Sequence, residues 1–234
     1  MIYLTRLSGT IKNPILKQAW KNIGGLSRTQ KMPGYSWSLS PDKCQFGKIL
    51  KKSPNNVCHI CYARKGNYTF KNVKYAHSRR FERWEENNEL WVKSMIQLMQ
   101  ECDCPFFRYF DSGDLQSYQM LMDIIEIAKA TPEMNYWLPT KEYLIIEAIT
   151  GMTIPPNLNI RVSAPIINQI LSKEKIKTLG WENCEITTSS VLAREKIILS
   201  DDVCIAVYNH TDCETEKCRK CWDRNVKNVI YMKH

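Results

Sequence analysis

The alternation of short strand-like stretches with longer helix-like stretches is the feature that most constrains the fold of this chain. The connections are long enough to hold helices, so neighbouring strands should be parallel and their crossovers right-handed. We therefore predict an α/β fold with a six-strand parallel sheet, either an open doubly wound sheet or a partial or full βα barrel. The predicted strands are Tyr35–Ser40, Phe106–Asp111, Asn135–Thr140, Leu158–Ala164, Cys184–Ser190 and Val203–Asn209.

The helices of this pattern follow from apolar residues at helical spacing. Residues 71–101 predict a continuous or broken helix that covers the sheet, and Leu121 to Ala128 predict a second helix closed by Thr131 and Pro132. The stretch "EYLIIEAI" predicts a third, short helix. We expect residues 1–34 to form an N-terminal extension, residues 35–210 the βα domain, and residues 211–234 a cysteine-rich tail packed on it.

Ten cysteines in 234 residues need an explanation other than core size, because a chain of this length buries a core without covalent staples. The opening stretch "MIYLTRLSGTIKN" lacks the pattern of a secretory signal, and no apolar run is long enough to cross a membrane. We therefore expect a cytosolic protein with no membrane partner. Disulfides are rare in the cytosol, so the cysteines point to metal ligands or redox chemistry.

The predicted strand ends sort the cysteines, because ligands of parallel α/β sheets bind at the carboxyl ends of the strands. One group follows the first predicted strand and another follows the sixth. In a closed or nearly closed sheet these strands are neighbours, so both groups should converge on one face. Cys102, Cys104, Cys184 and Cys204 belong to the amino-terminal side or the sheet interior and are expected to be structural, but whether Cys204 joins the ligands of the tail stays open. The predicted metal ligands are Cys44, Cys58, Cys61, Cys213, Cys218 and Cys221.

The spacing of the cysteines leaves the metal open. Short Cys-x-x-Cys turns bind both zinc and iron-sulfur clusters, and we favour a cluster over zinc and either over a redox thiol pair. Zinc would use the two Cys-x-x-Cys turns, at Cys58 and Cys61 and at Cys218 and Cys221. A cluster held by three cysteines would instead leave one iron open to a ligand.

Other polar residues also stand at predicted strand ends. Two carboxylates flank a glycine in the turn Asp111-Ser112-Gly113-Asp114, where they could hold a hydroxyl, an ammonium group or a metal, or could cap a helix. No P-loop, G-x-G-x-x-G or G-x-S-x-G motif is present. Further candidates for a polar rim, each with an ordinary structural alternative, are His59, Lys141, Arg161, Ser163, Ser189, Ser190, Asn209 and His210.

The formal charge of +9 makes an anionic partner plausible, and we expect this charge to be spread along the chain without a charged tail. The basic and aromatic stretch from Tyr62 to Trp84 fits two interpretations. It could bind nucleic acid through cations and stacking rings, or it could be an amphipathic helix that covers the sheet.

Several blocks of the sequence resemble one family. The stretches "KMPGYSWSLS", "VCHICYARKGNYTFKNVKYAHSRRFERW", "YFDSGDLQS", "WLPTKEY", "RVSAP" and "CRKCW" are similar to the bacteriophage gene product 88 family and extend over most of the chain. The resemblance implies a phage or prophage protein in an infected or lysogenic bacterial host, and it implies no particular reaction.

The layout also resembles, more distantly, the radical S-adenosylmethionine superfamily, whose six-strand partial barrel carries a three-cysteine 4Fe-4S cluster in its first loop. This resemblance implies a partial barrel, a cluster on Cys44, Cys58 and Cys61, and a second cluster in the tail. It also implies an enzyme that binds S-adenosylmethionine and acts on a small-molecule ligand. The chain departs from the superfamily in its lack of Gly-Gly-Glu and in the thirteen residues between Cys44 and Cys58. The implied cofactor-binding residues are Ile60, Ser112, Gly113, Asp114 and Ser163.

Overall fold

A computed structural model describes residues 11–200 and 202–233. Its centre is a seven-stranded sheet in which the strands follow one another in chain order. The first pair is antiparallel and each later pair is parallel. The strands are β1 (Ser27–Arg28), β2 (Tyr35–Trp37), β3 (Phe106–Tyr109), β4 (Asn135–Thr140), β5 (Leu158–Ser163), β6 (Thr187–Leu192) and β7 (Asn228–Met232). Each crossover therefore moves one strand further along the sheet in the same direction.

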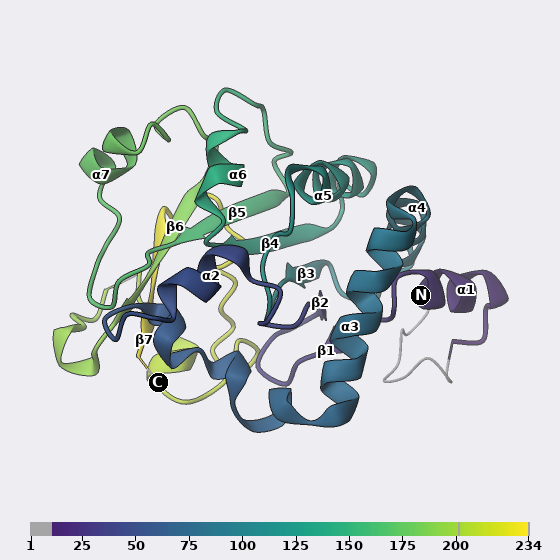
Figure 1. Ribbon diagram of the computed structural model, residues 1–234, viewed down its shortest axis with the longest axis horizontal. Helices are drawn as coiled ribbons and strands as arrows, with labels where there is room; N and C mark the ends of the chain where they lie inside the picture. The colour runs from purple at the N-terminus through teal and green to yellow at the C-terminus, as the bar shows by residue number, and fades with distance from the viewer. Residues whose placement is uncertain (1–10, 201, 234) are drawn as a thin grey trace.

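The helices pack mainly on one side of this sheet. In Figure 1, α1, α3 and α4 lie beside the β1–β2 end, α5 and α6 lie above β4 and β5, and β7 forms the other edge. The helices are α1 (Pro14–Asn22), α2 (Gln45–Leu50), α3 (Lys71–Glu86), α4 (Asn88–Gln100), α5 (Tyr118–Ala130), α6 (Tyr143–Glu147), α7 (Lys173–Thr178) and α8 (Ile205–Tyr208), with 3-10 turns η1 (Val57–Ile60), η2 (Tyr62–Arg64), η3 (Gly66–Thr69) and η4 (Arg194–Lys196).

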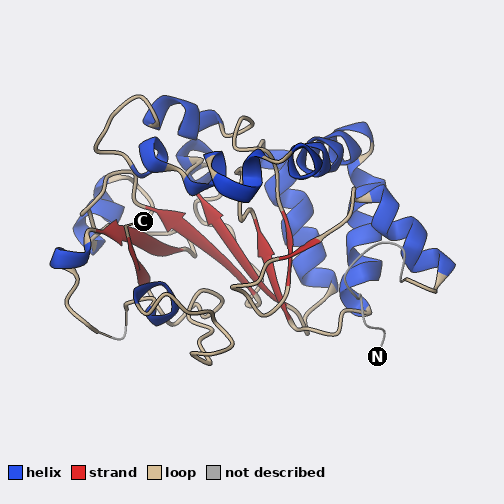
Figure 2. Cartoon of the chain, turned by 90° about the horizontal axis from the view of Figure 1, so that it is seen from below, coloured by secondary structure: helices blue, strands red, loops and turns tan. Residues whose placement is uncertain are grey.

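The two faces of the sheet differ in chemistry because successive residues of a strand point in opposite directions. Phe107, Tyr136 and Ile160 are completely buried in the main hydrophobic core beneath the helices. The residues that alternate with them include Arg108 and Trp137, which are register partners on neighbouring strands. Figure 2 shows helices on the upper side of the strands and mainly loop segments on the lower side. The face that carries Arg108 and Trp137 is thus covered mainly by loop segments and not by a layer of helices.

The predicted helices are present, with a break in the longest one. The segment 71–101 is divided into α3 and α4 at Asn87, whose side-chain oxygen accepts a hydrogen bond from the Leu90 N–H at 2.9 Å. This is an N-cap, which satisfies one of the free amides at the start of α4. Helices α5 and α6 coincide with the other two predictions.

Five of the six predicted strands are present within a few residues of their predicted bounds, and the sixth is wrong. Val203 makes an isolated bridge with Ile230, and the chain then turns into α8. The last parallel strand is instead β7, inside the segment that we expected to be a tail. Short apolar runs fit a strand or a helical turn equally well, so the choice between them depends on long-range pairing.

The sheet is also open, so its first and last strands are not neighbours: β2 pairs with β1 and β3, and β7 pairs with β6. The expected N-terminal extension is part of the same core, because Leu16, Ala19 and Ile23 are buried in it. Among the described residues, no helix is long and apolar enough to cross a membrane.

Candidate functional site

The loop between β2 and α3 brings Cys44, Cys58 and Cys61 together, as predicted; we call them the first-loop cysteines. Cys44 directly precedes α2, Cys58 lies in η1 and Cys61 follows it. The Sγ atoms of Cys44 and Cys58 each lie 3.7 Å from the position that a Cβ on Gly47 would occupy. The absent side chain of Gly47 therefore leaves room between two of the three sulfurs.

The surroundings of Cys44 and Cys58 favour protonated thiols when no metal is bound. Burial, followed by the charge of Asp114, raises the pKa of Cys44. Burial also raises the pKa of Cys58, whereas the cations Lys141 and Arg64 act in the opposite direction. The neighbouring Cys61 contributes to the rise at both thiols. Metal binding would release these protons, since only thiolates ligate a metal.

Two acidic residues lie just beyond the carboxyl ends of β3 and β4, and the second of them holds this loop. Asp114 accepts hydrogen bonds from the N–H groups of Leu115 and Lys141, each at 2.9 Å. Glu142 accepts from the N–H groups of Gln45 and Phe46 at 3.0 and 3.1 Å, and so it caps α2 directly beside Cys44. Burial, with a further contribution from Asp114, raises the pKa of Glu142 to about 7. The carboxyl end of β4 thus positions the first cysteine through Glu142.

Sequence reasoning missed Glu142, although the available signal was the same as for Asp114. Both are acidic residues within a few positions of a predicted strand end. We assigned Glu142 only to the short helix that follows. Its role depends on the approach of α2, which is almost a hundred residues earlier in the chain.

The residues of the Ser112-Gly113-Asp114 turn have different roles: the first two stabilise the turn, and the third lies near the site. The Ser112 hydroxyl donates to the Leu39 carbonyl at 2.7 Å, so it serves the turn itself. Gly113 has a φ of +78°, and a Cβ there would lie 2.7 Å from the Cβ of Leu39. Only glycine meets both conditions without strain. Of the three predicted residues, Asp114 is the one near the first-loop cysteines.

The end of β5 reaches the same loop. The backbone of Val57 donates to the Pro165 carbonyl at 2.9 Å, next to Cys58. Ser163 accepts at its carbonyl from the Tyr143 hydroxyl at 2.8 Å and at its own hydroxyl from Ser189 at 3.1 Å. Ile60 is half-buried between Cys58 and Cys61. Four strand ends therefore contribute to this side of the molecule.

Other predicted rim residues have different surroundings. The fully buried Arg161 donates to the carbonyls of Thr188 at 2.7 Å and Lys220 at 3.0 Å, and so it anchors the β6–β7 connection. His59 is exposed, with its Nδ1 2.9 Å from the Lys51 carbonyl. Asn209 and His210 were assigned to the wrong sixth strand and instead follow α8.

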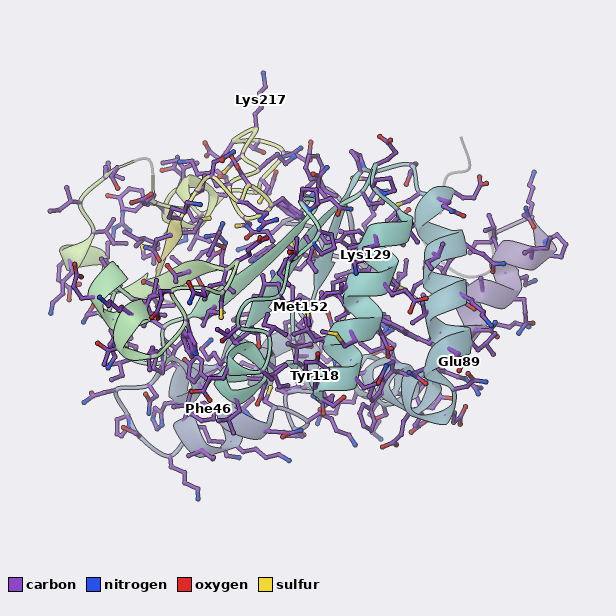
Figure 3. All side chains as sticks on the ribbon, turned by 90° about the horizontal axis from the view of Figure 1, so that it is seen from above. Phe46, Glu89, Tyr118, Lys129, Met152 and Lys217 are labelled. Carbon is purple, nitrogen blue, oxygen red and sulfur yellow. The ribbon has the colours of Figure 1, made fainter. Side chains whose placement is uncertain are left out.

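The prediction that all six cysteine ligands converge is wrong, because the tail cysteines precede β7 instead of following the last strand. The Cys221 carbonyl accepts from Asn159 at 2.9 Å, and Trp222 donates to the Phe107 carbonyl at 2.8 Å. These partners lie near the starts of β5 and β3. Figure 3 places Lys217 and Phe46 at opposite edges of the molecule, with strands between them.

A fourth cysteine, Cys204, belongs to this second group, so that the tail cysteines are Cys204, Cys213, Cys218 and Cys221. Cys204 donates its N–H to the carbonyl of Ile230 at 2.8 Å, and the Cys221 sulfur lies 3.0 Å from the hydroxyl of the next residue, Tyr231. Burial, followed by the charge of Cys221, raises the pKa of Cys204 to about 12. Burial, followed by Cys204 and Cys218, raises that of Cys213 to about 11. The sequence left open whether Cys204 joins the tail cysteines, because the predicted strand Val203–Asn209 placed it near the start of a strand.

Arg108 lies between the two cysteine groups, on the face of the sheet that also carries Trp137. Its guanidinium stacks 4.1 Å from the Trp137 ring centroid and donates to the Tyr62 hydroxyl at 3.3 Å. Its charge also reaches Cys213 and Cys221. The signal that we missed was a single cation within an aromatic strand, "FFRYFD".

The candidate metal ligands of both groups are cysteines without a disulfide. Within residues 11–200 and 202–233, no three side chains of His, Cys, Asp or Glu converge closely enough to surround one metal ion. Both cysteine groups nevertheless supply thiols alone, which is the ligand type of iron-sulfur clusters and of structural zinc. A cluster spreads its thiolates over several irons, so its ligands stand further apart.

Comparison with known proteins adds the family and nothing beyond it. No curated protein and no solved structure matched the chain. The family model described as gene product 88 matches residues 11–224, which include both cysteine groups and every strand except β7. The chain therefore belongs to the gene product 88 family.

Proposed function

We propose that this chain is an iron-sulfur protein in which the first-loop cysteines hold a 4Fe-4S cluster, and that it acts as a radical S-adenosylmethionine-like enzyme. One observation carries the proposal. Three thiols from the loop after the first parallel strand gather at the carboxyl ends of the following strands, beside Asp114 and Glu142. The sequential order of the six parallel strands is also that expected of a partial βα barrel.

Three features of the chain suit such a cluster. Gly47 leaves space between the sulfurs of Cys44 and Cys58. Lys141 and Arg64 act electrostatically on Cys58 and would offset the negative charge of bound thiolates. Three thiol ligands would leave one iron open to a ligand. When bound, the cluster would supply single electrons to that ligand.

The residues around the cysteines would hold the ligand. Asp114 spends one lone pair of each carboxylate oxygen on a backbone N–H, so it keeps acceptor capacity for an ammonium group or a hydroxyl. Ser163 at the end of β5 and Ser189 within β6 form a hydroxyl pair. Ile60 would shield the cluster from water. These are the groups that we assign to S-adenosylmethionine.

The tail cysteines support a second metal centre of a different kind. Four thiolates bound to one centre would leave no position open, which suits electron transfer or structure more than catalysis. Structural zinc is the alternative at this site. If zinc were the only metal that the protein binds, the protein would be a binding or scaffolding module without catalysis.

Metal analysis of protein purified without oxygen tests the proposal. We expect iron and acid-labile sulfide, and a reduced 4Fe-4S electron paramagnetic signal that changes when S-adenosylmethionine is added. Cys218→Ala should leave this signal in place, because it removes only the tail centre. Cys58→Ala and Cys61→Ala should abolish it, whereas Cys102→Ala, a half-buried cysteine outside both groups, should not.

Three results would count against the enzyme. Zinc without sulfide would refute the cluster, and a first-loop signal that survives Cys58→Ala would refute its ligands. A cluster signal that ignores S-adenosylmethionine would leave electron transfer or structure as its role.

A further inference from the structure

We infer that residues 43–81, which we call the basic segment, form a docking surface for single-stranded nucleic acid and present it to the first-loop cysteines. The inference rests on the proposed function only for the chemistry at the cysteines. Binding itself depends on the charge and exposure of this segment and can be measured separately.

The net charge of the chain is concentrated in this segment. Residues 43–81 contain ten Lys and Arg residues and no Asp or Glu, whereas the whole chain contains 33 basic and 24 acidic residues. The rest of the chain is therefore close to neutral. Our expectation that the charge is spread along the chain was wrong. A segment of one sign provides the electrostatic footprint of a polyanion partner.

The fold also brings these cations to one place. Arg64 forms an ion pair with Asp42 at 2.8 Å, and Lys51 and Lys74 both act on the same carboxylate, whose pKa is lowered chiefly by Arg64. These cations come from η2, from the end of α2 and from the start of α3. One exposed acidic group thus faces several cations, and most of their charge stays uncompensated.

Helix stability does not explain the lysines at the start of α3. Lys71 and Lys74 occupy the first turn of this 16-residue helix, and that turn contains no acidic residue. The positive end of the helix dipole disfavours cations there, so folding alone would select acidic residues. Both lysines are exposed to solvent, so their charges are available to a binding partner.

Exposed aromatic rings lie among the cations. Phe70 and Tyr75 are 56% and 67% exposed, and the ring of Tyr62 is 45% exposed. Arg79 stacks 5.5 Å from the Tyr75 ring centroid. A helix that merely covered the sheet would bury its large rings. Rings and cations together form the surface on which unpaired bases stack while their phosphates are neutralised.

The basic segment contains the first-loop cysteines, and the charge of its Arg64 acts on Cys58. A strand bound along α3 and the η turns would pass the carboxyl ends of β3 and β4. We therefore assign the substrate class of the site as nucleic acid, or a nucleotide within one.

The test uses fluorescence anisotropy with a labelled mixed-sequence DNA or RNA strand of about 20 nucleotides, longer than the site of one small domain. Binding should weaken steeply as salt rises from about 50 to about 200 mM. Lys71→Glu with Lys74→Glu should weaken binding by at least about tenfold and lower the salt slope by about two. Tyr75→Ala should weaken binding by about tenfold through lost stacking.

The matched control is Lys12→Glu with Lys17→Glu. These exposed lysines flank the start of α1, so the control makes the same charge change at an equivalent helix position outside the basic segment. It should leave binding within about twofold of the unmodified protein. Equal losses in both double variants would overturn the inference, as would binding that is insensitive to salt.

Two further measurements separate this inference from the proposed function. Iron and sulfide should stay constant in all the lysine variants, so a cluster protein without nucleic-acid binding would overturn this inference alone. Nucleic-acid binding without any cluster would overturn the proposed enzyme and retain the docking surface. Tighter binding to vesicles of acidic lipid than to the oligonucleotide would assign the surface to a membrane and refute nucleic acid.

Discussion

The first-loop cysteines and the tail cysteines use the same side chain in opposite surroundings. The first-loop group has three half-buried thiols beside Asp114 and Glu142, on a surface rich in exposed cations. The tail group has four thiols, with Cys204 and Cys221 buried in a small core with Trp137 and Trp222. A reactive centre needs an open position and access, whereas a structural centre needs a closed ligand set and burial. The difference therefore predicts different consequences of mutation.

Removal of a tail cysteine should have the largest effect on stability. Cys204→Ala should lower the free energy of unfolding by about 4 kcal/mol and release the metal that we propose for the tail, because a metal bound there would contribute directly to folding. Chemical unfolding with metal analysis of the same samples measures both. Cys184→Ala is the control, a buried cysteine outside both groups, and it should cost about 1 kcal/mol. Equal small losses would remove Cys204 from the tail centre.

The second-largest effect on stability should come from acid, which should lower the free energy of unfolding through His77. Burial, followed by the charge of Arg80, lowers the pKa of His77 from 6.5 to about 4, and its Nε2 lies 3.4 Å from the Ser112 hydroxyl. The depressed pKa means that the neutral ring favours folding above pH 6.5. This stability, about 3 kcal/mol, should be lost as the pH falls through about 4.

The pH dependence of unfolding for His77→Gln measures this contribution. The variant should lose less stability than the unmodified protein between pH 6.5 and about 4. Parallel profiles for His77→Gln and the unmodified protein would show that the buried ring does not couple folding to pH.

Loss of a first-loop cysteine should cost less stability than loss of a tail cysteine. Cys58→Ala should remove the first-loop cluster signal and yet lower the free energy of unfolding by only about 1 kcal/mol, because Cys58 is half-buried in a short 3-10 turn. Unfolding curves and the electron paramagnetic signal check the two halves of this prediction. A loss as large as that of Cys204→Ala would erase the distinction between the centres.

The smallest effect concerns Gly47. A methyl group there would lie 2.9 Å from the Cβ of Cys44 and 3.7 Å from both sulfurs. Gly47→Ala should lower the iron content at the first-loop cysteines, whereas stability should change by less than about 1 kcal/mol because helix propensity offsets the crowding. Iron per chain in a Cys218→Ala background measures this effect alone. Full iron content would mean that the loop relaxes around the methyl group.

Chain order made the first-loop site predictable. Cys44, Cys58 and Cys61 follow β2, and in a parallel sheet the loop after a strand must emerge at its carboxyl end. Asp114 and Lys141 follow the next two strands for the same reason. The roles of Glu142 and Arg108 were not predictable, because they depend on partners far away in the sequence.

The sequence by itself determined the alternation of strands and helices, the parallel direction of five predicted strands and the grouping of the first-loop cysteines. These features follow from local periodicity and from the handedness of crossovers. Only the tertiary structure decided between two apolar runs for the last strand. It selected Asn228–Met232, which pairs with β6, and left Val203 with a single bridge before α8. That choice moved the tail cysteines to the opposite side of the sheet and added Cys204 to them, because strand pairing and burial depend on the whole chain.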